Sequence, residues 1–476
     1  LDYLKREVRE AVIRTIIHVA RSFPIIRFDA AMVLTKKHFQ RLWYPPPGSG
    51  GDIPSRAGRG LSPAEFNRRF PKEFWREVVD RVAAEVPDTL LLAEAFWLLE
   101  GYFVRTLGMH RVYNSAFMNM LKMENNSQYR TLLKDFLEFE PQILKRFVNF
   151  MSNPDEATAA EGFGDGDKYF GVCSLMATLP GLPLFGHGQI EGFREKYGME
   201  FLRATQAEPV NRGLVQRHER EIFPLLKKRY LFSDVANFVL YDFFRETGAV
   251  DENVFAYSNR HGAERALVLY HNLYADTAGW IRVSAAQAEK RGGRKTGLRQ
   301  STLAEGLSLR TGEEDFTLFR ELRSGLEYIR SSRELQEKGF FTRLGPYQVK
   351  VFADFRVIRD GPERALSALE RNLRGRGVPN LDHEIRKLHF GPLHAAFRSL
   401  YNRTTVEEML AAARESRTPD EYGRRAKAIL DPVLTALFAA ASGYGGGIDE
   451  EAVGTSRRAL EAIFLLEGDE NLPGWT

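Results

Sequence analysis

The chain has 476 residues, of which 43% are apolar and 27% are charged, a composition typical of globular proteins and not of disordered ones. Its length is enough for about three domains. Lysine and arginine number 67 against 63 aspartate and glutamate, and a net charge of only +4 argues against nucleic acid as the main partner.

The single cysteine, Cys173, excludes an intrachain disulfide and favours a reducing compartment, so we expect a cytoplasmic protein. No apolar run approaches the roughly 20 residues of a membrane span, so no membrane association is expected. The first residues do not resemble a signal peptide and lack an initiator methionine, which predicts that the beginning of the protein is missing.

Helices alternate with short apolar runs in the first part of the chain. Residues 1–22 have the periodicity of an amphipathic helix, and residues 23–28 read as a buried strand that ends at Asp29. After a long loop rich in glycine and proline at 44–62 and a further helix, a second apolar run at 89–93 ends at Glu94. This alternation is typical of an α/β domain.

Three more apolar runs continue the pattern. Residues 107–113 predict a strand, residues 144–150 lead to Asp155, and residues 175–185 lead into a glycine-rich loop that contains His187. Five such units with helices between them predict a parallel sheet.

The pattern changes after about residue 232. Short runs without intervening helices predict an antiparallel β-domain, with strands at 236–244, 254–258, 265–272, 280–283 and 347–357. Residues 302–338 look mostly helical, as do residues 362–476, apart from a flexible break at 442–447. We therefore predict three regions: an α/β region at 1–232, a β-rich domain with a helical insertion at 233–360, and a helical tail at 361–476.

Three carboxylates follow predicted strands: Asp29, Glu94 and Asp155. In a β/α barrel the carboxyl ends of the strands face one cleft, where the catalytic residues lie. One carboxylate can attack an anomeric carbon, a second can protonate the leaving oxygen, and a third can stabilise positive charge on the sugar. Arg27, two residues before Asp29, would point the same way and keep it ionised. Acidic residues at strand ends are also common as helix caps and solvated loop residues.

Four segments resemble the motifs of the alpha-amylase family of glycoside hydrolases at its strands four, five, seven and eight: IRFDAA at 26–31, LLAEAFW at 91–97, FVNFMSNPDE at 147–156 and LPGLPLFGHGQ at 179–189. The resemblance covers roughly residues 1–290. It implies a retaining enzyme acting on α-glucans or maltooligosaccharides, in a (β/α)8 barrel of which strands four to eight are present. No redox cofactor or catalytic metal is implied.

By this resemblance Asp29 is the nucleophile, Glu94 the general acid and base, and Asp155 the transition-state stabiliser. Arg27 is the partner of the nucleophile, and both Arg27 and Asn153 are expected to bind the substrate. Two further residues have a second interpretation: Trp97 either stacks on a sugar ring or packs in the core, and His187 either binds substrate or has a structural hydrogen-bonding role.

The sequence departs from the family pattern in two ways. Pro154 stands where the family usually has a histidine, which keeps a maltosyl-transferring enzyme open as an alternative. Barrel strands one to three have no counterpart. Either a missing N-terminal barrel half completes the fold, or the chain is a truncated, non-catalytic carbohydrate-binding or assembly subunit.

Overall fold

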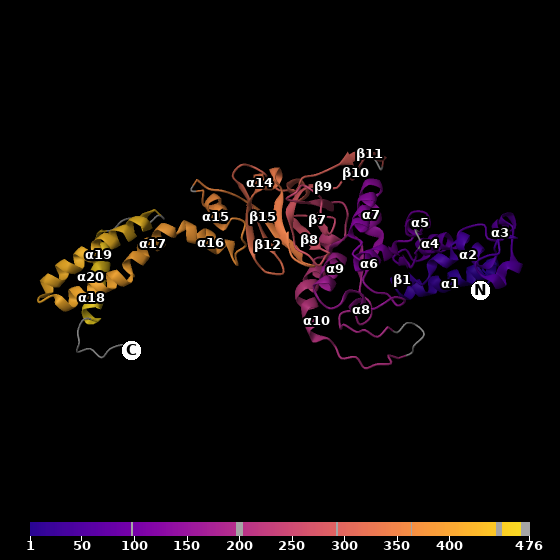
Figure 1. The fold of residues 1–476 in the computed structure, drawn as a ribbon, viewed down its shortest axis with the longest axis horizontal. Helices are drawn as coiled ribbons and strands as arrows, with labels where there is room; N and C mark the ends of the chain where they lie inside the picture. Colours follow the sequence, from indigo (N-terminus) through magenta and orange to yellow (C-terminus); the bar gives the residue numbers. More distant parts are fainter. Residues whose placement is uncertain (97–98, 197–202, 292–293, 363, 444–449, 468–476) are drawn as a thin grey trace. The chain divides into compact units, whose positions relative to one another are not determined.

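In the computed structural model the chain forms two compact units, residues 1–359 and residues 360–476. The structure describes residues 1–96, 99–196, 203–291, 294–362, 364–443 and 450–467. The first unit contains both main sheets, and the second is helical (Figure 1).

A five-stranded parallel sheet begins the first unit, with its strands side by side in chain order. The strands are β1 (Ile25–Phe28), β2 (Leu90–Ala93), β3 (Arg111–Tyr113), β4 (Phe147–Phe150) and β5 (Leu182–Leu184). The α-helices of this region are α1 (Arg6–Ser22), α2 (Lys36–Trp43), α3 (Pro63–Arg69), α4 (Phe74–Glu85), α5 (Glu100–Arg105), α6 (Ser115–Lys122), α7 (Asn126–Phe139), α8 (Ala159–Phe163), α9 (Asp167–Thr178), α10 (Arg212–Arg217), α11 (Phe223–Lys227) and α12 (Arg229–Phe232). Short 3-10 helices lie at Ala31–Leu34, Pro54–Arg59 and Pro141–Arg146. The predicted α/β alternation with a parallel sheet is confirmed.

The register of this sheet places the functional candidates on one face. Arg27 aligns with Leu92, and Leu92 aligns with Arg111. Side chains two residues apart on a strand share a face, so Asp29 and Glu94 follow on the same side just past the ends of β1 and β2. The sheet therefore brings polar groups from separate strands to one edge.

Three predicted strands were wrong in their extent. Of residues 107–113, only Arg111–Tyr113 form a strand, β3. Residues 175–178 are the end of helix α9, and β5 contains only three residues. Ten consecutive residues of α9, from Tyr169 to Thr178, are buried. A helix that is apolar on all sides has no period, so its sequence cannot be distinguished from that of a buried strand. Residues 144–146 likewise belong to a 3-10 helix that precedes β4.

An antiparallel sheet of eight strands follows, in the order β13-β12-β15-β8-β7-β6-β9-β14. Its strands are β6 (Val239–Arg245), β7 (Val254–His261), β8 (Glu264–His271), β9 (Thr277–Ser284), β12 (Asp315–Glu321), β13 (Glu327–Ser331), β14 (Phe340–Leu344) and β15 (Val349–Arg359). A separate hairpin, β10 (Gln287–Arg291) and β11 (Arg294–Arg299), extends from it. The predicted antiparallel sheet is confirmed.

The mostly helical character predicted for residues 302–338 was wrong. This segment has only two short helices, α13 (Leu303–Gly306) and α14 (Ser332–Glu337), on either side of the β12–β13 hairpin. Its many leucine, glutamate and arginine residues favour a helix locally. Pairing of β12 with both β13 and β15 overrides that preference, because tertiary context outweighs weak propensities.

Helices α7 and α9 join the two sheets. Gly171 in α9 lies against the Tyr270 ring of β8, where an added Cβ would stand 1.9 Å from the ring, so only glycine permits this approach. Arg130 in α7 is fully buried and donates to Glu252 at 2.7 Å, to Asp242 and to the Val254 carbonyl. The two sheets are therefore tied together by packing and by a buried charge network.

The second unit contains helices α15 (Ala365–Leu373), α16 (Leu381–His389), α17 (Gly391–Leu400), α18 (Arg403–Glu415), α19 (Pro419–Ser442) and α20 (Glu450–Glu467). Its own small core includes Met409, Ala426 and Leu430. Most of the break predicted at 442–447 lies outside the described residues.

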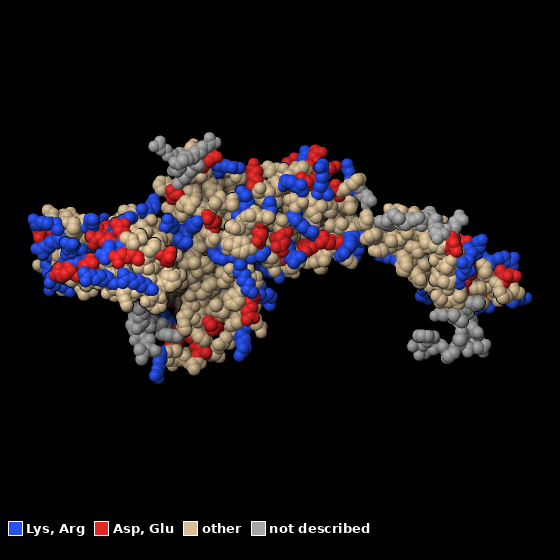
Figure 2. Space-filling model, turned by 180° about the vertical axis from the view of Figure 1, so that it is seen from behind, with Lys and Arg blue, Asp and Glu red and all other residues tan. Residues whose placement is uncertain are grey.

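Acidic and basic side chains alternate over much of the face shown in Figure 2, so no large patch of one sign dominates it. In the described part of the chain, no helix combines the length and apolar character needed to span a bilayer.

Candidate active site

Two of the three predicted carboxylates meet on one guanidinium. Arg27 donates from Nη2 to Glu94 Oε2 at 2.8 Å, and its Nη1 lies 3.5 Å from Asp29 Oδ2. Arg27 and Asp29 come from the end of β1, and Glu94 follows β2. The parallel pairing of β1 with β2 is therefore what brings the three side chains together.

The two carboxylates differ in exposure. The side chain of Asp29 is 42% exposed, whereas that of Glu94 is 2% exposed. Burial raises the pKa of Glu94, and the neighbouring Asp29 raises it further, while the Ala30 N–H and the Arg27 charge oppose the rise. Glu94 is thus the buried carboxyl with the raised pKa and Asp29 the one open to solvent, an arrangement that suits an acid and a nucleophile respectively.

The backbone around Asp29 is unusual. Ala30 adopts a left-handed conformation with φ of 42°, a position where a residue with a Cβ is strained. Its N–H donates to Glu94 Oε2 at 3.0 Å, and the Glu94 N–H donates to the Phe28 carbonyl at 3.0 Å. The bond from Ala30 thus fixes one oxygen of Glu94, and the bond to Phe28 fixes its backbone. The other oxygen, Oε1, is buried without a hydrogen-bond donor in the described part of the structure.

Tyr113 is a site residue that the sequence analysis missed. It ends β3, is 1% exposed, and its hydroxyl accepts a hydrogen bond from Arg27 Nε at 2.8 Å. The Arg27 guanidinium also lies 5.5 Å from the Tyr113 ring centroid. The rule that polar groups at strand ends form the site would have found Tyr113, because it occupies the same position on β3 as the carboxylates on β1 and β2.

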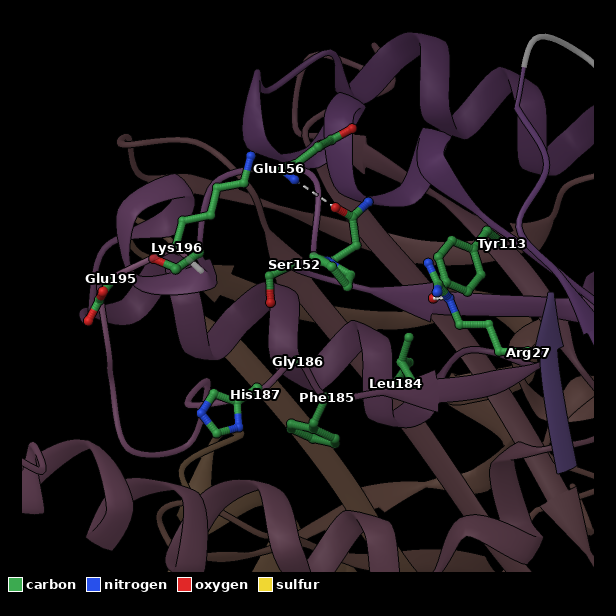
Figure 3. A pocket seen from close by; sticks show the side chains of 13 residues that line it. Arg27, Tyr113, Ser152, Glu156, Leu184, Phe185, Gly186, His187, Glu195 and Lys196 are labelled. Atoms are coloured by element: carbon green, nitrogen blue, oxygen red, sulfur yellow. Dashed lines mark hydrogen bonds between the residues drawn. The ribbon is translucent and has the colours of Figure 1, made fainter. Parts of the chain in front are cut away.

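A cavity of about 270 Å³ opens beside this cluster. Arg27 and Tyr113 line one side of it, and Glu195 and Lys196 lie on the opposite side (Figure 3). Its other lining residues come from the loop after β4 and from the end of β5 with its following loop: Ser152, Asn153, Pro154, Glu156, Thr158, Leu184, Phe185, Gly186 and His187. The predicted substrate residues Arg27, Asn153 and His187 thus share one cavity, whereas Asp29, Glu94 and Asp155 are not among its lining residues.

Asn153 organises the loop after β4. Its Oδ1 accepts hydrogen bonds from the N–H groups of Asp155 and Glu156 at 3.0 and 2.8 Å (Figure 3 shows the second). Its Nδ2 is buried and has no partner in the described part of the structure. Asp155 is exposed, and in the described part of the structure it does not take part in the ion pairs that join Arg27 to Asp29 and Glu94. Trp97 lies outside the described residues.

A buried hydrogen-bond chain supports the part of the cavity wall formed by the loop after β5. The Tyr169 hydroxyl donates to the Gln189 carbonyl at 3.0 Å and lies 2.9 Å from His218 Nε2. Gln189 Oε1 in turn accepts from the N–H of Gly186, a lining residue, at 3.0 Å. Because Tyr169 uses its proton on Gln189, His218 must carry its proton on Nε2. Burial lowers the pKa of His218 to about 4, which keeps the ring neutral.

Replacing Tyr169 with phenylalanine is expected to destabilise the protein by about 3 kcal/mol, because it leaves two buried polar groups without a partner. Urea unfolding followed by circular dichroism measures this change. Tyr274→Phe is the matched control, since that ring is 78% exposed and should shift stability by less than about 0.5 kcal/mol. Equal unfolding midpoints for the two variants would show that the chain of hydrogen bonds does not stabilise the cavity wall.

No protein-family model matches this chain, and no curated protein matches it in sequence. Solved structures do resemble it. A debranching enzyme from Nostoc punctiforme, in a crystal soaked with acarbose, aligns with a TM-score of 0.44 and 13% identity over 74% of this chain and 61% of that one. An alpha-amylase from H. orenii aligns at 0.40 and 15% identity over 74% and 65%, and a maltogenic alpha-amylase from Thermotoga neapolitana at 0.43 and 14% over 74% and 67%.

These structural neighbours are alpha-amylase family glycoside hydrolases. The chain spans about three fifths of the length of the Nostoc enzyme.

Proposed function

We propose that this chain carries the nucleophile and the acid–base group of an alpha-amylase-like enzyme, which hydrolyses or transfers α-glucosidic bonds with retention of configuration. The observation that supports it most is the cluster of Asp29, Arg27 and Glu94 at the carboxyl ends of two neighbouring parallel strands. One carboxylate is exposed, and the other is buried with a raised pKa, as a nucleophile and an acid require.

The proposed reaction has two steps. An oxygen of Asp29 attacks the anomeric carbon, and the glycosidic bond breaks as its oxygen takes the proton of Glu94. This leaves a glycosyl ester on Asp29 and a free sugar hydroxyl. The Glu94 carboxylate then removes a proton from water or from an acceptor sugar, whose oxygen attacks the same carbon and releases Asp29. Water gives hydrolysis, and an acceptor sugar gives the transferase alternative.

The remaining predicted residues have supporting roles in this proposal. Asn153 and His187 bind the sugar in the cavity, and the buried Nδ2 of Asn153 supplies a donor for a sugar hydroxyl. Asp155, whose side chain is exposed in the loop after β4, stabilises the charge on the sugar ring. Trp97 is proposed as a stacking residue from the sequence alone.

We also propose that β1 to β5 are strands four to eight of a (β/α)8 barrel, which a further polypeptide segment completes. In the described structure β1 and β5 each pair on one side only, and Ile25 of β1 is 56% exposed. Arg111 lies near Arg146, and neither has a carboxylate partner among the described residues. A further segment of the barrel could supply a carboxylate to this pair of like charges. Residues 1–232 are then barrel, 233–360 a β-rich domain, and 361–476 a helical tail.

A trapping experiment tests the function. The chain is incubated with α-maltosyl fluoride, and intact mass with peptide mapping follows any covalent adduct. A maltosyl adduct on the peptide that contains Asp29, absent in Asp29→Asn, is the expected result. A folded chain that binds maltotriose in calorimetry but forms no adduct would contradict catalysis and favour the alternative of a carbohydrate-binding subunit.

A further inference from the structure

The hydroxyl of Tyr113 has a proton for which the described residues provide no acceptor. A phenol oxygen can accept one hydrogen bond while its proton donates another. The Tyr113 oxygen accepts from Arg27 Nε at 2.8 Å, and the guanidinium must be the donor because it has no acceptor atom. No oxygen of the described residues accepts from Tyr113 in return. The proton is therefore available to a ligand.

The surroundings of Tyr113 keep this hydroxyl neutral and in place. Burial raises the pKa of Tyr113 above its ordinary value, although the charge of Arg27 opposes the rise. The ring centroid lies 4.8 Å from that of Phe150 and 6.5 Å from that of Phe96, so aromatic contacts fix the ring on two sides. Tyr113 is thus an ordered donor that keeps its proton at neutral pH.

The donor belongs to the wall of the candidate active site. Tyr113 and Arg27 lie together on one side of the cavity of about 270 Å³ (Figure 3). The guanidinium of Arg27 is occupied by Tyr113 and by the two carboxylates. Pro154, which lines the same cavity, has a side chain that cannot donate. The hydroxyl of Tyr113 therefore supplies a donor that these two neighbours do not.

A single guanidinium joins the Tyr113 hydroxyl to the proposed nucleophile. Arg27 uses Nε for Tyr113, and its Nη1 lies 3.5 Å from Asp29 Oδ2. The phenol and the carboxylate are thus held at a fixed spacing along one planar group. A sugar ring whose anomeric carbon faces Asp29 would bring its own hydroxyl groups close to Tyr113.

We propose that Tyr113 is a specificity-determining residue, which donates its hydroxyl proton to one hydroxyl oxygen of the sugar ring whose anomeric carbon faces Asp29. This inference rests on the proposed function. A ligand that lacks this hydroxyl would leave a buried donor unpaired, and sites that hydrogen-bond a ligand hydroxyl reject analogues without it for that reason.

Calorimetry with maltotriose, and with maltotriose analogues that each lack one hydroxyl, tests this role. All proteins in the comparison carry Glu94→Gln, so that the ligand is not consumed. Tyr113→Phe should raise the dissociation constant for maltotriose by about tenfold, equivalent to about 1.4 kcal/mol. The analogue that lacks the partner hydroxyl should bind equally with and without Tyr113→Phe, because the hydrogen bond is already lost.

Tyr241→Phe is the matched control. Tyr241 is also buried, and its hydroxyl lies 2.7 Å from Ser258 Oγ in the antiparallel sheet, so this change should leave every dissociation constant as it was. A penalty of the same size for every analogue would mean that Tyr113 only positions Arg27, and the inference would be overturned. An unchanged affinity in Tyr113→Phe, or no binding of maltotriose before that change, overturns it as well.

The outcomes separate this inference from the proposed function. Labelling of Asp29 by α-maltosyl fluoride together with a uniform penalty in Tyr113→Phe leaves the catalytic proposal standing and overturns only the role of Tyr113. A penalty that disappears for one analogue supports the role of Tyr113 in sugar recognition even where no adduct forms on Asp29, and in that case only the catalytic proposal fails.

Discussion

Replacing Glu94 with glutamine is expected to lower kcat/KM for maltooligosaccharides by about 10²–10⁴-fold, the usual contribution of general acid–base catalysis. Glutamine keeps an oxygen that can accept from Arg27 and from the Ala30 N–H, so the site should retain its shape. What it loses is the proton that the leaving oxygen takes in the proposed mechanism. Initial rates of maltoheptaose cleavage measure the effect.

The leaving group provides an internal check on this role. Fluoride leaves without a proton, so formation of the Asp29 adduct from α-maltosyl fluoride should be much less affected in Glu94→Gln than cleavage of a natural bond. Glu100→Gln is the matched control, because burial also raises the pKa of Glu100 but it forms no ion pair with Arg27 in the described structure. An equal loss of rate with α-maltosyl fluoride and with a natural maltooligosaccharide would mean that Glu94 positions other groups and does not supply the proton.

Although Glu94→Gln should lower activity, it should raise the stability of the folded protein at neutral pH. The pKa of Glu94 is raised in the folded state above its ordinary value of 4.5, mainly by burial. Its stabilising contribution is therefore complete below that value and is lost as the pH rises through the folded-state pKa. Glutamine carries no charge and avoids this loss. Glu94→Gln should melt at a higher temperature than the wild type at neutral pH, and the difference should disappear toward pH 4.5.

Replacing Arg27 with glutamine is expected to lower kcat/KM by about 10²-fold, because misplacement of reacting groups by an ångström has an effect of this size. Arg27 is the contact that Asp29, Glu94 and Tyr113 share. Its charge also lowers the pKa of Glu94. Without it the pKa of Glu94 should rise further, and the acid form should persist to higher pH.

A pH–rate profile distinguishes this effect from a general loss of structure. The alkaline limb of kcat should move to higher pH in Arg27→Gln. Arg27→Lys should keep part of the effect of the positive charge on the pKa of Glu94 but recover little activity. An ammonium group cannot contact Asp29, Glu94 and Tyr113 at once, as the planar guanidinium does. Arg111→Gln, on the same face of the sheet but without a carboxylate partner in the described residues, should leave the limb unchanged. An alkaline limb that stays in place in Arg27→Gln would contradict the proposed coupling.

Local sequence was sufficient where short apolar runs stop at a charged residue. The runs before Asp29 and Glu94 are too short for helices, and their ends mark the ends of β1 and β2 within a residue. The two-residue period then places Arg27 on the same side as Asp29, as the ion pair between them shows. The parallel and antiparallel parts of the chain could be separated on the same local grounds, by whether helices intervene.

Only the tertiary structure decided the features that depend on distant neighbours. From Tyr169 to Thr178 helix α9 is buried on every side, so only its surroundings distinguish this segment from a strand. The contact of Tyr113 with Arg27 and the hydrogen-bond chain through His218 join residues far apart in the chain. The apolar residues around Glu94 in the sequence suggest a raised pKa, but the actual burial of its side chain is decided by the tertiary structure. Burial, which the whole fold produces, makes Glu94 the one with the raised pKa, because desolvation depends on every element packed around a charge.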